Sequence, residues 1–248
     1  MAARQGGRRT SASMDVVFDR PKALVVMMTI SHRMTGRLAH AALGCWACLI
    51  GLAATDRASA NPPVHAVAND ERAPSIAECI AAGSGVESIS MLLDAGRDPL
   101  APDGDGDTPM HAAAMVRDPT YLQLLLARQL SPDVSNRITG RTPIMSAMLA
   151  ERDRQVTLLL AAGANVALAD AMGNTPLHIA AQINEPGYVL ALLEAGAPAA
   201  ARNAQRQTFQ RYLFMTADHL LNDETRRERR AVASWLVRRG IALETAAP

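Results

Sequence analysis

Lysine and aromatic residues are almost missing from this sequence. Its 248 residues contain one lysine, Lys22, and aromatic side chains make up 3% of the chain. The formal net charge is only +1. A nucleic-acid-binding domain usually carries a strong basic excess on one face. The composition therefore argues against nucleic acid as a partner.

Cysteine is also scarce, with three residues in the whole chain. Cys45 and Cys48 have the C-x-x-C spacing that is typical of a redox pair or of half a zinc site. They lie, however, within an uncharged run, residues 38–55, and no further ligand set accompanies them. We interpret the pair as part of an apolar segment that is removed. Cys79 would then remain alone, as a buried core thiol that cannot form an intramolecular disulfide.

The apolar run has the flanks of a secretory signal peptide. Arg33 and Arg37 precede it, and the small residues Ala58 and Ala60 follow it at small-x-small spacing. A positive start, an apolar middle and such a cleavage site define a signal peptide. The sequence therefore predicts export through a signal peptide at residues 28–60.

Export sets the boundaries of the remaining N-terminal segments. Residues 1–27 are interpreted as a start-site extension without order, and residues 61–71 as a linker. The Ala/Arg-rich composition is typical of bacteria, so the predicted compartment is the periplasm. An uncleaved inner-membrane anchor that faces the periplasm is the alternative, although the 18-residue run falls short of the roughly 20 apolar residues that span a bilayer.

The predicted mature chain, residues 61–248, differs in charge from the whole. It contains 17 arginines, no lysine and 21 acidic residues, which gives a formal net charge of about −4. Its 188 residues are enough to bury a core by packing alone.

An internal repeat runs through this mature part. Three tetrapeptides recur at spacings of 34 and 33 residues, and Thr208 follows after another 33. The tetrapeptides are Thr108-Pro109-Met110-His111, Thr142-Pro143-Ile144-Met145 and Thr175-Pro176-Leu177-His178. Leu-Leu pairs and an Asp or Asn before each Thr recur in step with them. Such a period indicates a repeat architecture.

Each unit predicts a tight turn followed by two helices. The Asp or Asn opens the turn, and a glycine such as Gly140 supplies its positive φ. Thr caps the first helix, and Pro stands at the first helical position, where its missing N–H costs nothing. The Leu-Leu pair marks the buried face of the second helix, which ends at a glycine such as Gly163.

The pattern resembles the ankyrin repeat, whose T-P-L-H-x-A signature is matched in full by residues 175–180. The resemblance implies an all-α solenoid of about five helix-turn-helix repeats with short finger turns, preceded here by the signal peptide. It covers residues 72–245, and the predicted repeats are 72–102, 103–135, 136–169, 170–202 and 203–245.

Several departures from the family pattern predict local differences. Ser75 replaces the capping Thr in the first repeat, as in a terminal cap. Gln129 stands where a glycine should end a helix, which predicts an altered turn. Met145 replaces the motif histidine of the third repeat. The last repeat keeps Thr208 and holds an insertion near residues 222–230, in or beside its inter-helix loop; it is a modified cap or a specific functional element.

The residues that could carry chemistry also have plainer interpretations. In the family, the motif histidines His111 and His178 hydrogen-bond locally and brace the turn. Asp103, Asp105 and Asp107 imitate the start of a calcium loop but lack its later glycine and glutamate, so a finger turn is favoured. The arginine run 226–230 predicts a solvated helix face. We expect no enzymatic activity, no cofactor and no metal.

A protein partner is expected on the concave face, at the tips of the finger turns and the ends of the first helices. The tip positions are Asp105, Asp107, Thr139, Arg141, Met172, Asn174, Gln205 and Gln207. The helix-end positions are Met115, Leu149, Gln182, Ile183 and Met215. Four of these, Met115, Leu149, Ile183 and Met215, would form an apolar stripe, unless helix packing hides them. Tyr212 is the aromatic candidate for binding, whereas Phe214 and Trp235 are expected in the core.

These features predict a non-enzymatic periplasmic binding module. Its most concrete form is an immunity or inhibitor protein against an envelope-targeting toxin, and the alternative is an adaptor or protective factor in envelope or oxidative stress. We expect a monomer that binds another protein and neither nucleic acid nor a small-molecule substrate. Contact with the membrane would be transient, through the signal peptide.

Overall fold

The computed structural model describes residues 73–244, and all regular elements within that range are helical. The predicted N-terminal extension, signal peptide and linker lie outside the described residues. The helices are α2 (Ile76–Ala81), α3 (Val86–Asp94), α4 (Pro109–Met115), α5 (Thr120–Ala127), α6 (Pro143–Leu149), α7 (Asp153–Ala161), α8 (Pro176–Gln182), α9 (Pro186–Glu194), α10 (Phe209–Leu213), the 3-10 helix η2 (Asp218–Leu220) and α11 (Asp223–Arg238).

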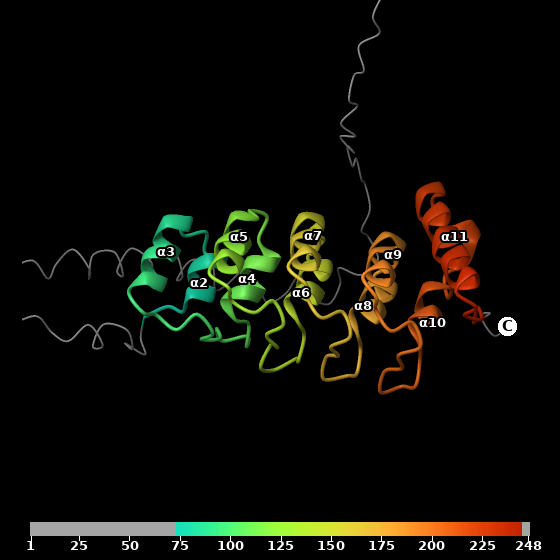
Figure 1. Cartoon of the computed structure of the whole chain (residues 1–248), viewed down its shortest axis with the longest axis horizontal. Coiled ribbons are helices and arrows are strands. Elements are labelled where there is room, and N and C mark those ends of the chain that lie inside the picture. Colours follow the sequence, from blue (N-terminus) through green and yellow to red (C-terminus); the bar gives the residue numbers. More distant parts are fainter. Residues whose placement is uncertain (1–72, 245–248) are drawn as a thin grey trace, which may run out of the picture. The chain divides into compact units, whose positions relative to one another are not determined.

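The helices follow one another as pairs. The first helices, α2, α4, α6, α8 and α10, each pack against the next in the series, and α3, α5 and α7 do the same among the second helices. Figure 1 shows the pairs side by side, with the long turns between pairs all on one side of the helices. The predicted all-helical solenoid of helix-turn-helix repeats is therefore confirmed. No helix between residues 73 and 244 is both long enough and apolar enough to cross a membrane.

Local signals explain where the first helices begin. Thr108, Thr142 and Thr175 stand at N-cap positions with extended backbone, and each is followed by a proline at the first helical position. Small residues then allow close helix packing, since Ala113 and Ala180 are fully buried at 0% exposure. The first helices thus form the central layer of the core.

The second helices supply the leucines of the core and end in left-handed residues. Leu125, Leu159 and Leu192 are fully buried. Gly163, with φ of 78°, ends α7 and donates its N–H to the Leu160 carbonyl at 3.0 Å. A glycine adopts this conformation without the steric cost that a Cβ brings.

The prediction of an altered turn at Gln129 is wrong. Gln129 adopts φ of 60° and donates to the Leu126 carbonyl at 2.9 Å, as the glycine of the next repeat does. The helix-ending hydrogen bonds therefore outweigh the strain of a left-handed residue with a side chain, which costs roughly 1 kcal/mol.

The last pair differs from the others in length. Helix α10 has 5 residues and α11 has 16, whereas the other second helices have 8 or 9. Residues 222–230 lie beside the inter-helix loop, where Asn222 caps α11 and the following residues form its first turns. The loop itself spans residues 214–222 and contains η2.

Candidate functional site

Four finger turns connect the helix pairs from the first to the last. Finger 1 is residues 103–107, finger 2 is 136–141, finger 3 is 170–174 and finger 4 is 203–207. In each, the side-chain oxygen of the opening Asp or Asn accepts backbone N–H groups of its own turn. Asp170 Oδ1, for example, accepts from Met172 N at 2.9 Å and from Asn174 N at 2.8 Å. Each finger is therefore held by its first residue.

Backbone hydrogen bonds also join each finger to the next. The donors Arg137, Ala171 and Ala204 reach the carbonyls of the preceding finger at 2.9 to 3.0 Å. The acceptors are Gly106, Thr139 and Met172 respectively. The fingers thus form a ladder, which keeps the side chains at their tips at a fixed spacing.

The motif histidines connect the first helices to this ladder. His111 Nδ1 accepts the Thr108 N–H at 3.3 Å and lies 2.9 Å from the Thr108 hydroxyl oxygen. Its Nε2 therefore carries the proton and donates to the Arg141 carbonyl in finger 2 at 2.9 Å. Burial lowers the pKa of His111, because it disfavours the imidazolium form. This histidine is a structural bridge between repeats.

His178 makes the same connection one repeat before the end. It contacts Thr175 through Nδ1 and donates from Nε2 to the Gln207 carbonyl in finger 4 at 3.0 Å. Its pKa is likewise lowered by burial. In the third repeat Met145 replaces the histidine, and the buried Thr142 Oγ1 has no hydrogen-bond partner among the described residues.

The predicted binding residues divide by exposure into three groups. One is buried, Asn174. Six are exposed: Asp105, Leu149, Met172, Gln182, Gln205 and Met215. Seven are half-buried: Asp107, Met115, Thr139, Arg141, Ile183, Gln207 and Tyr212.

Two of these positions, the buried Asn174 and the half-buried Tyr212, support the turns. Asn174 is 8% exposed, and its amide accepts from Asn203 Nδ2 at 2.9 Å. Tyr212 accepts a second hydrogen bond from Asn203 Nδ2 at 2.8 Å, and its ring meets His178 edge-on. The prediction of an exposed tip is wrong for the buried Asn174, because its side chain serves as an acceptor for the Asn203 amide. The half-buried Tyr212 also accepts from Asn203, and its role in binding stays a prediction.

The structure adds Ile138 to the exposed tips. Its backbone N–H donates to Asn136 Oδ1 at 2.8 Å, as Met172 does to Asp170, and its side chain is 66% exposed. The sequence prediction counted back from the capping Thr142 and so placed Thr139 at the tip. Finger 2 is one residue longer than its neighbours, which shifts the tip to Ile138. Counting forward from the opening Asn would have found Ile138.

The predicted apolar stripe is only partly exposed. Leu149 and Met215 expose 40% and 63% of their surface. Ile183 is half-buried and packs against the core, so helix packing covers part of it, and Met115 is half-buried as well. The stripe therefore has two well-exposed positions, at the ends of α6 and α10.

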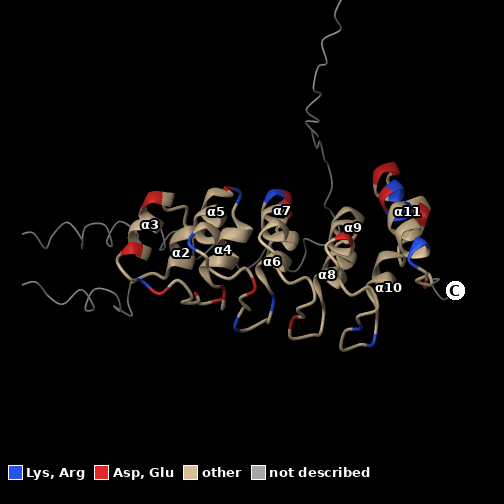
Figure 2. Ribbon diagram, viewed as in Figure 1, with Lys and Arg blue, Asp and Glu red and all other residues tan. Residues whose placement is uncertain are grey.

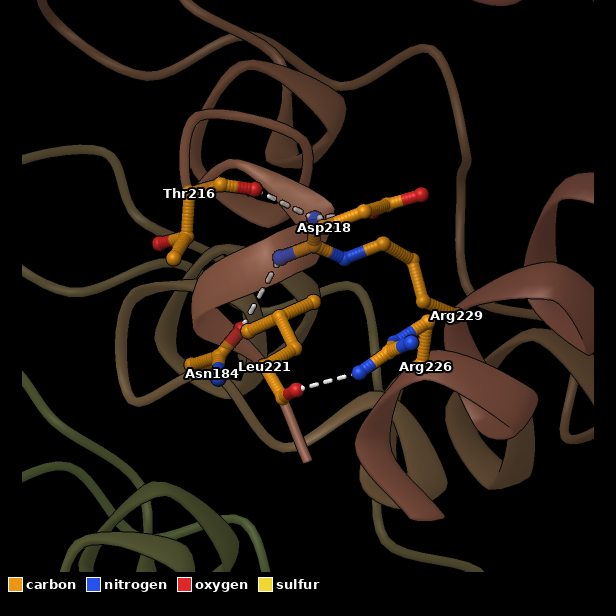
Figure 3. A network of polar contacts seen from close by, with 6 residues as sticks. All are labelled: Asn184, Thr216, Asp218, Leu221, Arg226 and Arg229. Carbon is orange, nitrogen blue, oxygen red and sulfur yellow. Dashed lines mark hydrogen bonds and ion pairs between the residues drawn. The ribbon is translucent and has the colours of Figure 1, made fainter. Parts of the chain in front are cut away.

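The arginine run at residues 226–230 includes one buried residue. Arg229 is 4% exposed and donates to the Thr216 carbonyl at 2.6 Å, to Asp218 at 3.2 Å and to Asn184 Oδ1 at 3.3 Å (Figure 3). Burial lowers its pKa. The interpretation of the whole run as a solvated face is wrong for Arg229, which ties the loop before α11 to the preceding repeat.

Two carboxylates of finger 1 accept hydrogen bonds from groups within the fingers. Asp103 Oδ1 accepts the N–H groups of Asp105 and Asp107 at 2.9 Å each, and Asp107 Oδ1 accepts from Asn136 Nδ2. Residues 73–244 contain no group of three His, Cys, Asp or Glu side chains placed to hold a metal ion. Cys79 is buried. The exposed surface of the fingers and helix ends is the candidate site.

Comparison with known proteins gives relatives that differ widely in length. Protein PhlB of Serratia liquefaciens is 51% identical over 98 residues, which cover 40% of this chain and 43% of PhlB. Neurogenic locus notch homolog protein 2 of Homo sapiens is 32% identical over 114 residues, 46% of this chain and 5% of that protein. The chain thus spans less than half the length of PhlB and a small part of notch homolog protein 2.

A family model gives the more general result. The model described as ankyrin repeats (3 copies) matches residues 76–170 and again residues 118–203. Together these ranges run from α2 to finger 4, over about half of the sequence. The predicted resemblance is confirmed, and the chain belongs to the ankyrin repeat family.

Proposed function

We propose that this protein is a periplasmic, non-enzymatic binding module that inhibits a toxin directed at the cell envelope, as an immunity protein does. Ankyrin repeats act as protein–protein interaction modules and are typically non-enzymatic scaffolds. The features of a signal peptide support the periplasm, and a match to a bacterial protein agrees with it.

The observation that carries the proposal is a set of exposed apolar side chains on the finger turns and at the ends of the first helices. The opening Asp and Asn side chains and the backbone amides of the finger turns hold the turns together, whereas large apolar side chains such as Ile138, Leu149, Met172 and Met215 remain exposed. Fixed, solvent-exposed apolar groups usually mark an interface. Preorganised side chains also bind with a smaller loss of conformational entropy.

Capture of a partner tests the binding surface. The full chain, tagged at its C-terminus and produced with its own N-terminal segment, would be isolated from the periplasmic fraction together with bound proteins. Leu149→Asp with Met215→Asp should reduce capture at least tenfold. Val237→Asp, at a residue 60% exposed on α11, is the matched control and should leave capture unchanged.

Inhibition is then measured on the captured protein. We expect a secreted hydrolase whose activity falls when the chain is added in equal amount. A captured protein with full activity in the complex would contradict the inhibitor role and favour an adaptor or protective factor. Recovery of the chain only in the cytoplasm, or an N-terminus upstream of Asn61, would contradict export through the cleaved signal peptide.

A further inference from the structure

The finger ladder is divided by charge. Finger 1 carries only acidic charges, from Asp103, Asp105 and Asp107, while fingers 2 and 4 carry only arginines. Figure 2 shows the red segments of the turn before α4 and the blue segments of the turns before α6 and α10. Finger 3 carries one acid, Asp170, so fingers 2 to 4 together hold three arginines and one aspartate and differ in net sign from finger 1.

The arginines of this basic part have no carboxylate partners in the described chain. Arg137, Arg141 and Arg206 lie in fingers 2 and 4, and Arg202 precedes finger 4. None of the ion pairs found among residues 73–244 includes any of these four arginines. Arg137 and Arg206 are exposed. Arg202 Nη1 already donates to the Arg206 carbonyl at 2.8 Å. The exposed guanidinium groups of Arg137 and Arg206 can bind carboxylates, which guanidinium groups recognise with two parallel hydrogen bonds.

The one acid in fingers 2 to 4 is already occupied. Asp170 Oδ1 accepts the backbone N–H groups of Met172 and Asn174, and its Oδ2 accepts from the Asn174 side chain at 3.2 Å. Its carboxylate serves finger 3 and does not pair with the arginines. Fingers 2 to 4 therefore keep their excess of arginines, with no ion pair to Asp170 among the described residues.

Two large apolar side chains stand among these arginines. Ile138 and Met172 lie at the tips of fingers 2 and 3 and expose 66% and 52% of their surface. The fingers are neighbours, because Ala171 N donates to the Thr139 carbonyl at 2.9 Å. An apolar pair with arginines on either side along the ladder matches a segment that has apolar anchors flanked by carboxylates.

We propose that fingers 2 to 4 bind an acidic segment of a protein partner that places an apolar side chain against Ile138 and Met172. The acidic finger 1 repels the carboxylates of that segment and so fixes its position along the ladder. This inference rests on the proposed function as a binding module and names the chemistry of its partner.

A library of random twelve-residue peptides, displayed on phage, tests the proposal without a known partner. Selection on the full chain should enrich Asp and Glu together with large apolar residues. A synthetic peptide from the selected set should lose at least tenfold in affinity when salt rises from about 50 mM to 500 mM, because exposed charge pairs are screened.

Charge reversal shows whether the fingers are the site. Arg137→Glu with Arg206→Glu should weaken the selected peptide at least tenfold. Arg154→Glu with Arg230→Glu makes the same change of charge on exposed residues of α7 and α11 and should have little effect. Ile138→Ser with Met172→Ser should also weaken binding, without removing its salt dependence.

The outcomes separate the two proposals. Selection that enriches no peptides or basic ones, or acidic peptides that bind both charge-reversed variants equally, would overturn the acidic-segment inference. If the captured periplasmic partner is released by Leu149→Asp with Met215→Asp but bound normally by the finger variants, the binding function stands and this inference fails. If acidic peptides bind fingers 2 to 4 but no periplasmic protein is captured, binding of an acidic segment stands and the periplasmic inhibitor role fails.

Discussion

At the scale of single residues, the buried Thr142 hydroxyl lacks a hydrogen-bond partner among the described residues. In the second and fourth repeats a histidine contacts both the capping Thr and the next finger, but Met145 cannot. A buried hydroxyl without a partner costs about 1–3 kcal/mol. The third repeat therefore lacks a bridge that its neighbours have.

Met145→His should restore that bridge. Nδ1 would accept from Thr142, and Nε2 would face the Asn174 carbonyl, which corresponds to the acceptors at Arg141 and Gln207. We expect the free energy of unfolding to rise by about 1 kcal/mol, measured by urea denaturation at pH 8. Met145→Gln, which offers a capping side chain without the ring, is the comparison and should gain less. A loss of stability in Met145→His alone would show that the ring does not fit.

The two motif histidines also predict a dependence on pH. Burial lowers both pKa values below 6.5, so the folded imidazoles stay neutral where those of the unfolded chain become protonated. The unfolded state then binds more protons, and the free energy of unfolding falls as the pH drops below about 6.5. The fall ends once the folded imidazoles are protonated too.

Urea denaturation between pH 8 and pH 5 measures this effect. The wild-type chain should lose stability over that range, and a variant with both His111→Gln and His178→Gln should lose clearly less. The comparison concerns the change with pH, since the variant starts from lower stability. Parallel curves for the two proteins would assign the pH dependence to other groups.

At the scale of elements, the finger turns depend on close backbone approach. Gly140 has φ of 70°, and a Cβ there would lie 2.8 Å from the Ala171 backbone nitrogen. Gly163 has φ of 78°, but a Cβ there would meet nothing within 4 Å. The two glycines share a backbone conformation and differ in their neighbours, which makes them a matched pair.

Gly163→Ala should cost about 1 kcal/mol, the strain of a left-handed residue with a Cβ. Gly140→Ala should cost about 3 kcal/mol, because the methyl group also pushes finger 3 away from finger 2. Thermal and urea unfolding of the two variants would give the difference directly. Equal losses would mean that the ladder between the fingers adjusts without cost.

The loop before α11 is held by a charge that the fold buries. Arg229→Met keeps much of the side-chain volume but leaves the Thr216 carbonyl and the Asn184 amide without their donor. We expect a loss of about 2–3 kcal/mol in unfolding free energy. Arg230→Met, on the exposed neighbour, should change it by less than about 0.5 kcal/mol. A similar loss of unfolding free energy in both variants would show that Arg229 stabilises the fold no more than an exposed arginine does.

Sequence reasoning reached the elements that depend on local signals. Thr, Pro and Gly at fixed offsets mark helix starts and ends, because capping and positive φ are properties of a few neighbouring residues. It missed Ile138, because one added residue shifts the register between Asn136 and Thr142. It also missed the burial of Arg229, which depends on contacts with the loop of residues 214–222 and with Asn184, 45 residues away in the chain.

At the scale of the whole repeat array, residues 241–244 contact the start of the last described helix pair. Glu244 accepts from the Thr208 hydroxyl at 2.8 Å, and its N–H donates to Gln210 Oε1 at 3.1 Å. Gln210 is 3% exposed and donates to the Ala242 carbonyl at 3.2 Å. These contacts provide hydrogen-bond partners for the polar groups at the start of α10. At the start of α8, His178 provides such a partner for Thr175 and connects it to finger 4.

A truncation after Gly240 should therefore destabilise the array as a whole. It removes three hydrogen bonds to Thr208 and Gln210 and the packing of Ile241 against the core, which together contribute about 3 kcal/mol. A truncation after Glu244 keeps every described residue and is the control. Because each repeat is stabilised mainly by its neighbours, loss of the end should appear first as faster hydrogen exchange in α10 and α11 and then in α8 and α9. Unchanged hydrogen exchange in α10 after removal of residues 241–248 would show that α10 and α11 are stable without the contacts of these residues.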